Sequence, residues 1–257
     1  MVIRSLADPP ARLGKNTGTE EEPARPGRTV YCVPSAGTGA HGFLVPFARS
    51  SLRRNLRVVQ LPGREDRLGE PCLEDLPRMA ELIAAAIATQ VAEEGGDYAL
   101  FGHSFGAMVM FETVQVLERM RVPAPALLAV AACAPPIFPS LVRFERMEPV
   151  EMVKALRDLG GADFSGPRGG EMATLVFPSL RADCLALTRY IESPGQKAVA
   201  CPILAMGGTQ DTAVPMGKIA LWRDHTESAF MTREFAGGHF FPVESDLPLR
   251  AVVDWNP

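Results

Sequence analysis

The sequence lacks an excess of positive charge, a secretory segment and an uninterrupted apolar run long enough to cross a membrane. Its 26 Lys and Arg against 30 Asp and Glu give a net charge of -4, whereas nucleic-acid binding needs a basic surface. Residues 1–8 have no apolar core of a signal peptide, and four prolines interrupt the longest apolar stretch, residues 124–142. We therefore expect a cytoplasmic protein with neither a nucleic acid nor a membrane as partner.

Cysteine and histidine are also scarce. The five cysteines, at positions 32, 72, 133, 184 and 201, include no C-x-x-C pair, which argues against a zinc or redox site of that kind. Most of them lie in apolar surroundings, as reduced core cysteines of a cytosolic protein do. The four histidines stand at positions 41, 103, 225 and 239, so a reaction that needs an imidazole base has few candidates.

The length of 257 residues suffices for one large α/β domain with a well-buried core. Residues 1–27 are rich in Pro, Gly, Glu, Arg and Thr and lack apolar periodicity, which predicts a disordered leader. We expect the ordered domain to span residues 28–257.

From about Arg28 onward, β-prone and helical segments alternate. This alternation predicts an α/β fold with a mostly parallel central sheet and helices on both of its faces. The expected strands are 29–34, 56–61, 98–102, 126–132, 202–206 and 230–235, and the expected helices are 42–54, 76–94, 105–120, 216–225 and 248–255.

The alternation breaks between residues 136 and 196. This segment contains two helical stretches, 149–159 and 172–191, and no clear strand. An insertion after a central strand is typical of a lid over an active site, so we predict a helical lid insertion at 136–196. Five apolar residues would form either the lining of the lid or its own packing core: Met147, Leu156, Leu159, Phe164 and Phe177.

The segment Gly102-His103-Ser104-Phe105-Gly106 carries the strongest chemical signal. It lies between an expected strand and an expected helix, which is the context of a nucleophile elbow. In such a strained turn, a β-carbon at either glycine would clash with neighbouring backbone. The turn exposes the Ser104 hydroxyl at the helix N-terminus and directs the Phe105 amide at a developing oxyanion. These features predict an α/β-hydrolase fold with Ser104 as the nucleophile.

Ser104 needs a base and an orienting acid, which in this fold follow in the order Ser, Asp or Glu, His. His239 lies in a loop of glycines and phenylalanines near the C-terminus and is the expected base. Asp211, shortly after the strand 202–206, is the expected acid. Three other residues of this region are interpreted as structural, the first as a surface helix cap: His225, Asp224 and Glu234.

A second oxyanion donor is expected from the loop after the first strand. This loop is Pro34-Ser35-Ala36-Gly37-Thr38-Gly39, and we expect the backbone N–H of Ala36 to be the donor, with Gly37 as its neighbour. The alternative is a simple glycine-rich turn. No Gly-Lys-Ser/Thr follows the loop, so a P-loop for phosphate is excluded.

With these residues placed, the chain from about Arg28 onward resembles the type II thioesterases, the free-standing editing hydrolases of polyketide and nonribosomal-peptide assembly lines. The family's triad carries over onto Ser104, Asp211 and His239. The resemblance rests on residues 33–37, 60–67 (Gln-Leu-Pro-Gly-Arg-Glu-Asp-Arg), 98–107, and 207–211 together with 237–241; residues 180–183 also resemble the family's lid helix beside the active-site entrance. The chain departs from the family pattern at Ser35, Thr38 and Cys133.

The resemblance implies an acyl or peptidyl carrier protein as the partner, with the acyl group held as a thioester on its phosphopantetheine arm. It implies an acyl-serine intermediate on Ser104, with His239 as base and Asp211 orienting the imidazole. No metal or organic cofactor is expected, and we expect a monomer. Two other classes stay open: a general carboxylesterase, acyltransferase or product-releasing thioesterase with the same triad, and a non-catalytic binding protein, which usually loses a triad residue.

Overall fold

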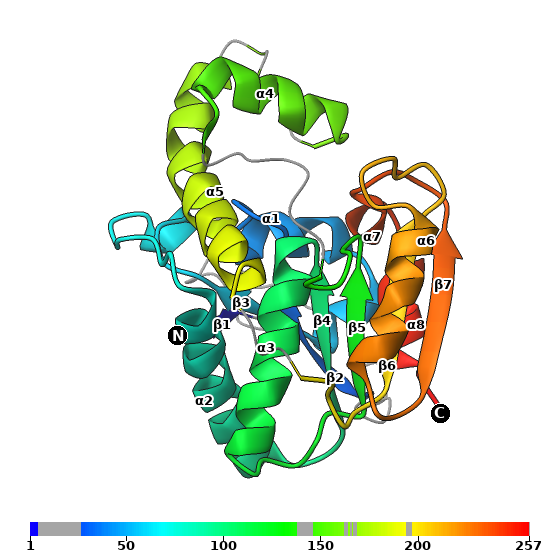
Figure 1. Cartoon of the computed structure of the whole chain (residues 1–257). Coiled ribbons are helices and arrows are strands. Elements are labelled where there is room, and N and C mark those ends of the chain that lie inside the picture. The colour runs from blue at the N-terminus through cyan, green and yellow to red at the C-terminus, as the bar shows by residue number, and fades with distance from the viewer. Residues whose placement is uncertain are drawn as a thin grey trace, which may run out of the picture.

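The centre of the molecule is a seven-stranded sheet in the order β1-β3-β2-β4-β5-β6-β7 (Figure 1). The computed structural model describes residues 1–4, 27–137, 146–161, 164, 166, 169–193 and 197–256. Strand β1 pairs antiparallel with β3, and the other neighbouring strands pair in parallel. The strands are β1 Val2–Arg4, β2 Thr29–Val33, β3 Leu56–Gln60, β4 Tyr98–His103, β5 Leu127–Ala131, β6 Ile203–Gly208 and β7 Phe230–Phe235.

Helices lie on both faces of this sheet, as the sequence predicts. Successive side chains of a strand point to opposite faces, so Leu100 packs with α2 and α3 whereas Phe101 packs with α1 and α8. Strands β4 and β5 are buried along their whole length, which explains their apolar character. The helices are α1 Ala40–Leu44, α2 Leu76–Glu94, α3 Phe105–Arg119, α4 Pro149–Asp158, α5 Gly169–Ile191, α6 Met216–Ile219, α7 Phe241–Glu244 and α8 Leu247–Val253.

The expected helix 42–54 is wrong. In its place, α1 is followed by 3₁₀ turns at Val45–Phe47 and Ser51–Arg54. Pro46 has no N–H for a further α-helical hydrogen bond, so α1 ends before it. The second 3₁₀ turn begins where the Ser50 hydroxyl accepts a hydrogen bond from the Leu52 amide. The apolar residues of the segment are still buried, because short turns also direct them at the sheet.

The expected disorder at the N-terminus is wrong for three residues. Val2–Arg4 form β1 and pair with residues 58–60 of β3 at the edge of the sheet. Their backbone pairs with β3, and Ile3 packs against the core, which the overall composition of residues 1–27 does not reveal. Residues 5–26 lie outside the described part of the chain.

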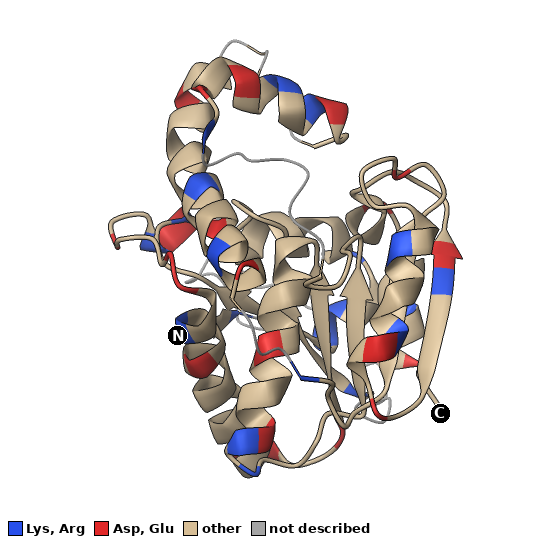
Figure 2. Cartoon of the chain, viewed as in Figure 1, with Lys and Arg blue, Asp and Glu red and all other residues tan. Residues whose placement is uncertain are grey.

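The two helices expected between residues 136 and 196 are α4 and α5, which lie above the carboxyl ends of the strands (Figure 1). Met152 of α4 shares a small apolar cluster with Phe177 and Leu180 of α5. Charged residues of both signs lie along α4 (Figure 2). Residues 138–145 and 194–196 lie outside the described residues. None of the described helices combines the length and apolar character needed to cross a membrane.

His225 is not the surface cap that the sequence suggested. It is buried at the end of the 3₁₀ helix Ala220–His225, where its ring contacts Phe111 and Trp222 edge-on. Burial lowers the pKa of His225 below its ordinary value. The neighbouring Trp222 is fully buried and donates a hydrogen bond from its indole nitrogen to the Cys133 carbonyl at 2.7 Å. The connection between β6 and β7 therefore anchors the loop that follows β5.

Replacing Trp222 with Phe tests this anchor. The substitution leaves a cavity and an unpaired buried carbonyl, so we expect the free energy of unfolding to fall by roughly 2–3 kcal/mol. Urea denaturation followed by circular dichroism measures the loss. Leu247→Ala, at a largely exposed position, is the matched control and should change stability by less than about 0.5 kcal/mol. Equal effects of the two substitutions would contradict the anchor.

Candidate active site

The backbone at Ser104 has the strained geometry of a nucleophile elbow. Ser104 lies between β4 and α3 with φ of 54° and ψ of -117°. A β-carbon at Gly102 would lie 2.3 Å from the Cα of Ala107, and one at Gly106 would lie 2.0 Å from the Val33 carbonyl oxygen. Both obstacles are backbone atoms that cannot rotate away. The predicted requirement for these two glycines is therefore confirmed.

The structure brings Ser104, His239 and Asp211 together from three separate strand ends. The Nε2 atom of His239 lies 3.0 Å from the Ser104 hydroxyl oxygen, and its Nδ1 atom lies 2.9 Å from Oδ2 of Asp211. Asp211 follows β6, and His239 follows β7. Because parallel strands end at one edge of a sheet, residues far apart in the sequence meet there. The arrangement can pass a proton from Ser104 to His239 while Asp211 holds the imidazole.

The Asp211 carboxylate is held in its ionised form. Its other oxygen, Oδ1, accepts hydrogen bonds from the amides of Ala213 and Val214 at 3.0 and 3.1 Å. Burial by itself raises the pKa of this carboxyl. The hydrogen bond and charge of His239, together with the two amides, outweigh burial and lower the pKa below its ordinary value. Asp211 is therefore suited to stabilise an imidazolium.

The amides of Phe105 and Ala36 are the expected oxyanion donors. Phe105 is the first residue of α3, where an amide has no acceptor within its own helix. In the loop after β2, the Gly37 amide donates to Oδ2 of Asp183 at 2.8 Å and the Thr38 amide donates to the Ser35 carbonyl at 3.1 Å. These bonds engage the amides of Gly37 and Thr38, and the Ala36 amide stays the expected donor.

His103 precedes Ser104 in the elbow, and its ring contacts the backbone of the loop that carries His239. It is buried, and its Nε2 atom lies 2.8 Å from the carbonyl oxygen of His239. Desolvation, with a smaller contribution from nearby His239, lowers the pKa of His103 to about 3. The neutral ring can therefore donate its Nε2–H to that carbonyl. His103 ties the strand before Ser104 to the loop that carries the base.

The remaining candidates of the sequence have other surroundings. His41 is exposed on α1, and its amide donates to the Glu65 carboxylate. Glu234 is exposed on β7, and Asp224 is exposed in the 3₁₀ helix that buries His225. The interpretation of the two acids as structural agrees with these positions. Among the described residues, no group of three His, Cys, Asp or Glu side chains gathers as metal ligands would.

The sequence analysis does not predict the ion pair between Arg64 and Asp183. The two terminal guanidinium nitrogens of Arg64 each lie 2.9 Å from one oxygen of the Asp183 carboxylate, and both side chains are buried. The two residues are 119 positions apart. Each lies in a segment that the resemblance to the type II thioesterases singled out, 60–67 and 180–183, but the motifs alone do not reveal that they touch.

Two hollows lie near the triad. The apolar hollow, of about 470 Å³, lies between the loop at Ala36, α5 and Phe240. The polar hollow, of about 250 Å³, is lined in part by Asp211 and His239. Side chains that line the apolar hollow include Leu68, Leu156, Phe164, Met172, Leu175 and Val176. The apolar hollow thus borders the loop of the expected oxyanion donor, and the polar hollow borders His239 and Asp211.

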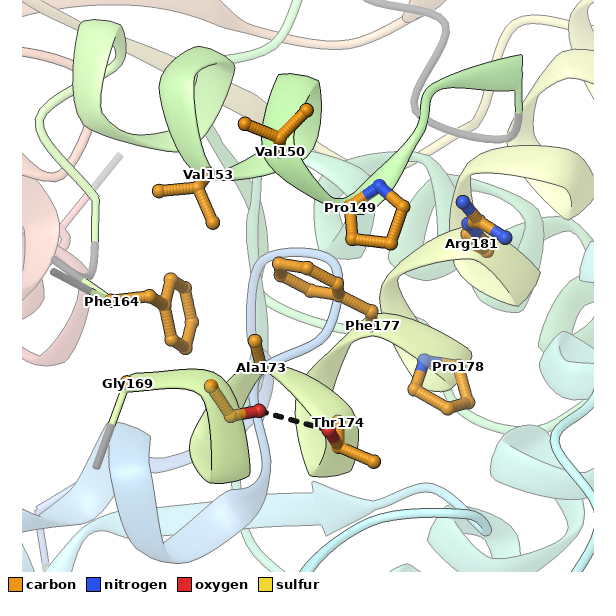
Figure 3. Close-up of a pocket in the computed structure, with 11 residues that line it drawn as sticks. Pro149, Val150, Val153, Phe164, Gly169, Ala173, Thr174, Phe177, Pro178 and Arg181 are labelled. Atoms are coloured by element: carbon orange, nitrogen blue, oxygen red, sulfur yellow. Dashed lines mark hydrogen bonds between the residues drawn. The ribbon is translucent and has the colours of Figure 1, made fainter. Parts of the chain in front are cut away.

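A third hollow, of about 600 Å³, lies between α4 and α5 (Figure 3). Val150 and Val153 of α4 face Ala173 and Phe177 of α5 across it. Phe164 borders both this hollow and the apolar hollow, and its ring meets that of Phe177 at 5.5 Å. The five residues that the sequence offered as lining or packing all belong to the apolar cluster between α4 and α5. Four of them also line a hollow: Leu156, Leu159, Phe164 and Phe177.

Comparison with known proteins identifies the family. A family model described as a thioesterase domain matches residues 28–254. The chain belongs to the thioesterase domain family. It is a hydrolase acting on thioesters, and its α/β-hydrolase fold is the one that the sequence predicts.

Individual members of the thioesterase family are similar to this chain over most of their own length. Thioesterase PikA5 of Streptomyces venezuelae is 36% identical over 215 residues, which cover 82% of this chain and 74% of that protein. The solved structure of the thioesterase RedJ from the prodiginine pathway of Streptomyces coelicolor has a TM-score of 0.76 at 30% identity and covers 93% of this chain and 89% of its own. The type II thioesterase BorB from the borrelidin biosynthetic cluster also has a TM-score of 0.76 at 30% identity, with 98% and 94% covered.

His103→Gln tests the burial of a neutral imidazole beside the base. In the unfolded chain His103 has its ordinary pKa of 6.5, against about 3 in the fold. Between these values the unfolded state binds more protons, so stability falls as the pH is lowered from 6.5, by up to about 1.4 kcal/mol per pH unit. Glutamine can still donate to the His239 carbonyl but does not titrate.

We therefore expect a shallower decline of stability for His103→Gln than for the wild type. Urea denaturation at pH 7, 6, 5 and 4 measures both slopes. Superimposable slopes would show that His103 contributes no buried neutral group.

Proposed function

We propose that this thioesterase is a type II, editing enzyme that hydrolyses acyl groups from phosphopantetheine thioesters on acyl or peptidyl carrier proteins. One observation carries the proposal: Ser104, His239 and Asp211 form a continuous relay, with contacts of 3.0 and 2.9 Å, in a chain similar to the type II thioesterase BorB. Another relative is the Gramicidin S biosynthesis protein GrsT of Aneurinibacillus migulanus, 30% identical over 217 residues.

In the proposed acylation, the Ser104 oxygen attacks the thioester carbonyl carbon while His239 Nε2 takes the hydroxyl proton. The carbonyl electron pair moves onto oxygen, where the Phe105 and Ala36 amides stabilise the charge. The tetrahedral intermediate then collapses, the carbon–sulfur bond breaks and the imidazolium gives its proton to the pantetheine sulfur. The products of this half-reaction are an acyl-Ser104 ester and a free thiol on the carrier protein.

In the proposed deacylation, water replaces the departed thiol. His239 removes a proton from this water as its oxygen attacks the ester carbonyl, and the same two amides stabilise the second oxyanion. Collapse returns the proton to the Ser104 oxygen and releases the free acid. Asp211 stays ionised throughout and stabilises the imidazolium in both steps, in agreement with its lowered pKa. These steps use only side chains and amides of this chain.

We further propose that residues 136–196 act as a lid and that the apolar hollow receives the acyl chain. The side chains of α4 and α5 supply most of its apolar lining, and Ala36, the expected oxyanion donor, lies at its edge. The thioester carbonyl would then lie at the hollow's inner end. All three residues of the triad come from one chain, which supports a monomer as the active unit.

The function is tested with a butyryl group on three carriers: a phosphopantetheinylated carrier protein, free pantetheine and p-nitrophenol. We expect the carrier thioester to be hydrolysed with the highest kcat/KM, because the enzyme then binds the arm and its protein together. Ser104→Ala should abolish turnover of all three, while its circular dichroism spectrum and melting temperature confirm that it folds.

Turnover of p-nitrophenyl butyrate alone would contradict the carrier-protein assignment and favour a general carboxylesterase. Turnover by Ser104→Ala at the wild-type rate would contradict the assignment of the nucleophile. Transfer of the butyryl group to an added alcohol in preference to water would favour an acyltransferase.

A further inference from the structure

A buried ion pair lies beneath the loop that carries the expected oxyanion donor. The Arg64 guanidinium contacts both oxygens of Asp183, each at 2.9 Å, and the side chains are 5% and 0% exposed. Oδ2 of Asp183 also accepts the Gly37 amide at 2.8 Å. One carboxylate thus joins the segment after β3, the helix α5 and the loop after β2.

A contribution to the stability of the fold is a poor explanation for this buried ion pair. Removing two charges from water costs several kcal/mol per ion, and replacing a buried pair with well-packed apolar side chains is often neutral or stabilising. The pair lies neither in the triad nor on the surface. Its third partner, the Gly37 amide, indicates a different role, because Gly37 directly follows Ala36.

The loop after β2 is a type II turn whose central peptide unit Asp183 holds. The Thr38 amide donates to the Ser35 carbonyl, which closes a four-residue turn. Gly37, at the third position, has φ of 73°, whereas Ala36 at the second position is not among the residues with positive φ. This combination defines a type II turn, in which the central peptide is flipped by about 180° relative to type I. A flip would turn the Ala36 carbonyl toward the Asp183 carboxylate.

The helix α5 is in direct contact with this turn. A β-carbon on Gly37 would lie 3.1 Å from Cβ of Leu180 and 3.4 Å from the Cα of Leu180, so the backbone of the turn and the helix touch. Asp183 and Leu180 are three residues apart and share one face of the helix. Contact and hydrogen bond therefore join the turn to the same surface of α5.

The segment after β3 holds the other end of the same loop. The Gln60 side chain donates to the Arg64 carbonyl at 2.9 Å and accepts the Ala40 amide at 2.6 Å. The Glu65 carboxylate accepts the amides of His41 and Gly42, both at 2.9 Å. These bonds fix Arg64 relative to the beginning of α1, so that its guanidinium meets Asp183 in a fixed position.

We propose that Arg64 and Asp183 are positioning residues for the oxyanion hole, and that through them the seating of α5 sets the orientation of the Ala36 amide. Asp183 selects the type II orientation of the peptide between Ala36 and Gly37, and Arg64 orients Asp183. The donor N–H of Ala36 shares its peptide plane with the Ser35 carbonyl, which accepts the Thr38 amide across the turn. The turn that Asp183 holds through Gly37 therefore also fixes the direction of that N–H. The inference rests on the proposed function and adds that α5 helps to assemble the oxyanion hole as well as to cover the site.

The decisive variant is the double substitution Arg64→Met with Asp183→Leu, which removes both charges and keeps apolar volume. Because no unpaired charge remains, we expect it to fold. Loss of a positioned oxyanion donor should lower kcat for p-nitrophenyl butyrate by about 10²-fold, with KM within about threefold. Asp183→Asn retains an acceptor for the Gly37 amide but weakens the contact to Arg64, and should lower kcat on the order of tenfold.

Binding of hexyl trifluoromethyl ketone distinguishes a role of Arg64 and Asp183 in positioning the oxyanion donor from a general role in stabilising the fold. Attack by Ser104 gives a hemiketal oxyanion that resembles the tetrahedral intermediate, so its affinity should fall by the same factor as kcat/KM. Glu112→Gln is the matched control, because the buried Glu112 accepts a hydrogen bond from Tyr190 of α5 at 3.0 Å, far along the helix from Gly37. This control should keep kcat and ketone affinity within about threefold of the wild type.

A folded double variant with wild-type kcat would overturn the inference, as would a loss of kcat without a loss of ketone affinity. If the double variant does not unfold cooperatively, it is not folded and Asp183→Asn becomes the deciding variant. Wild-type kcat and wild-type ketone affinity in Asp183→Asn would also overturn the inference. The ester requires the oxyanion hole whatever the natural acyl donor is. Failure of the proposed carrier substrate therefore shows separately, as wild-type turnover of the ester without turnover of the carrier thioester.

Discussion

The whole site depends on one constraint, the strained backbone at Ser104 between a fully buried strand and a largely buried helix. Residues 105–117 of α3 are all buried, and β4 pairs on both sides with parallel strands. A non-glycine residue with φ of 54° and ψ of -117° is tolerated where tightly packed surroundings hold it in place. The strain places the Ser104 hydroxyl above the sheet and leaves the first amide of α3 beside it.

Strand order and buried hydrogen bonds place the partners of Ser104. The strands β4, β5, β6 and β7 are consecutive neighbours in the sheet and run parallel, so the loops after β6 and β7 bring Asp211 and His239 to Ser104. Buried polar groups then orient these loops: His103 donates to the His239 carbonyl, and the amides after Asp211 fix its carboxylate. Each of these groups is satisfied by the backbone or by another member of the site, which is the condition for a buried polar network to be rigid.

Much of the site could be predicted because its residues carry local signals. The glycines of the elbow, the order of Ser104, Asp211 and His239, and the loop with Ala36 all follow from motif context and strand order. The contact of Arg64 with Asp183 has no such signal, because it joins distant segments by a side-chain geometry that sequence spacing does not encode. The burial of His225 was missed for a similar reason: the polar stretch around it conceals the contact with Phe111 and Trp222.

Helices and strands are predictable from the sequence where apolar residues recur with a strong period. They are less predictable where local hydrogen bonds determine the backbone conformation. α2 was expected at its observed bounds, Leu76–Glu94, because its apolar residues recur at helical spacing and Asp75 caps its first turn. The segment after Ala40 has the same apolar character, but Pro46 and the Ser50 cap divide it into turns. At the N-terminus, Val2–Arg4 is too short to show a strand pattern and gains its structure from pairing with β3.

The central claim, an acyl-Ser104 intermediate common to all substrates, is tested most directly by product partitioning in buffer that contains methanol. Butyryl carrier protein and p-nitrophenyl butyrate have different leaving groups but should form the same butyryl enzyme, which water and methanol then divide. The account predicts the same ratio of methyl butyrate to butyrate from both substrates, and neither product with Ser104→Ala. Ratios that differ with the leaving group would show that the two substrates share no acyl-enzyme and would contradict the account.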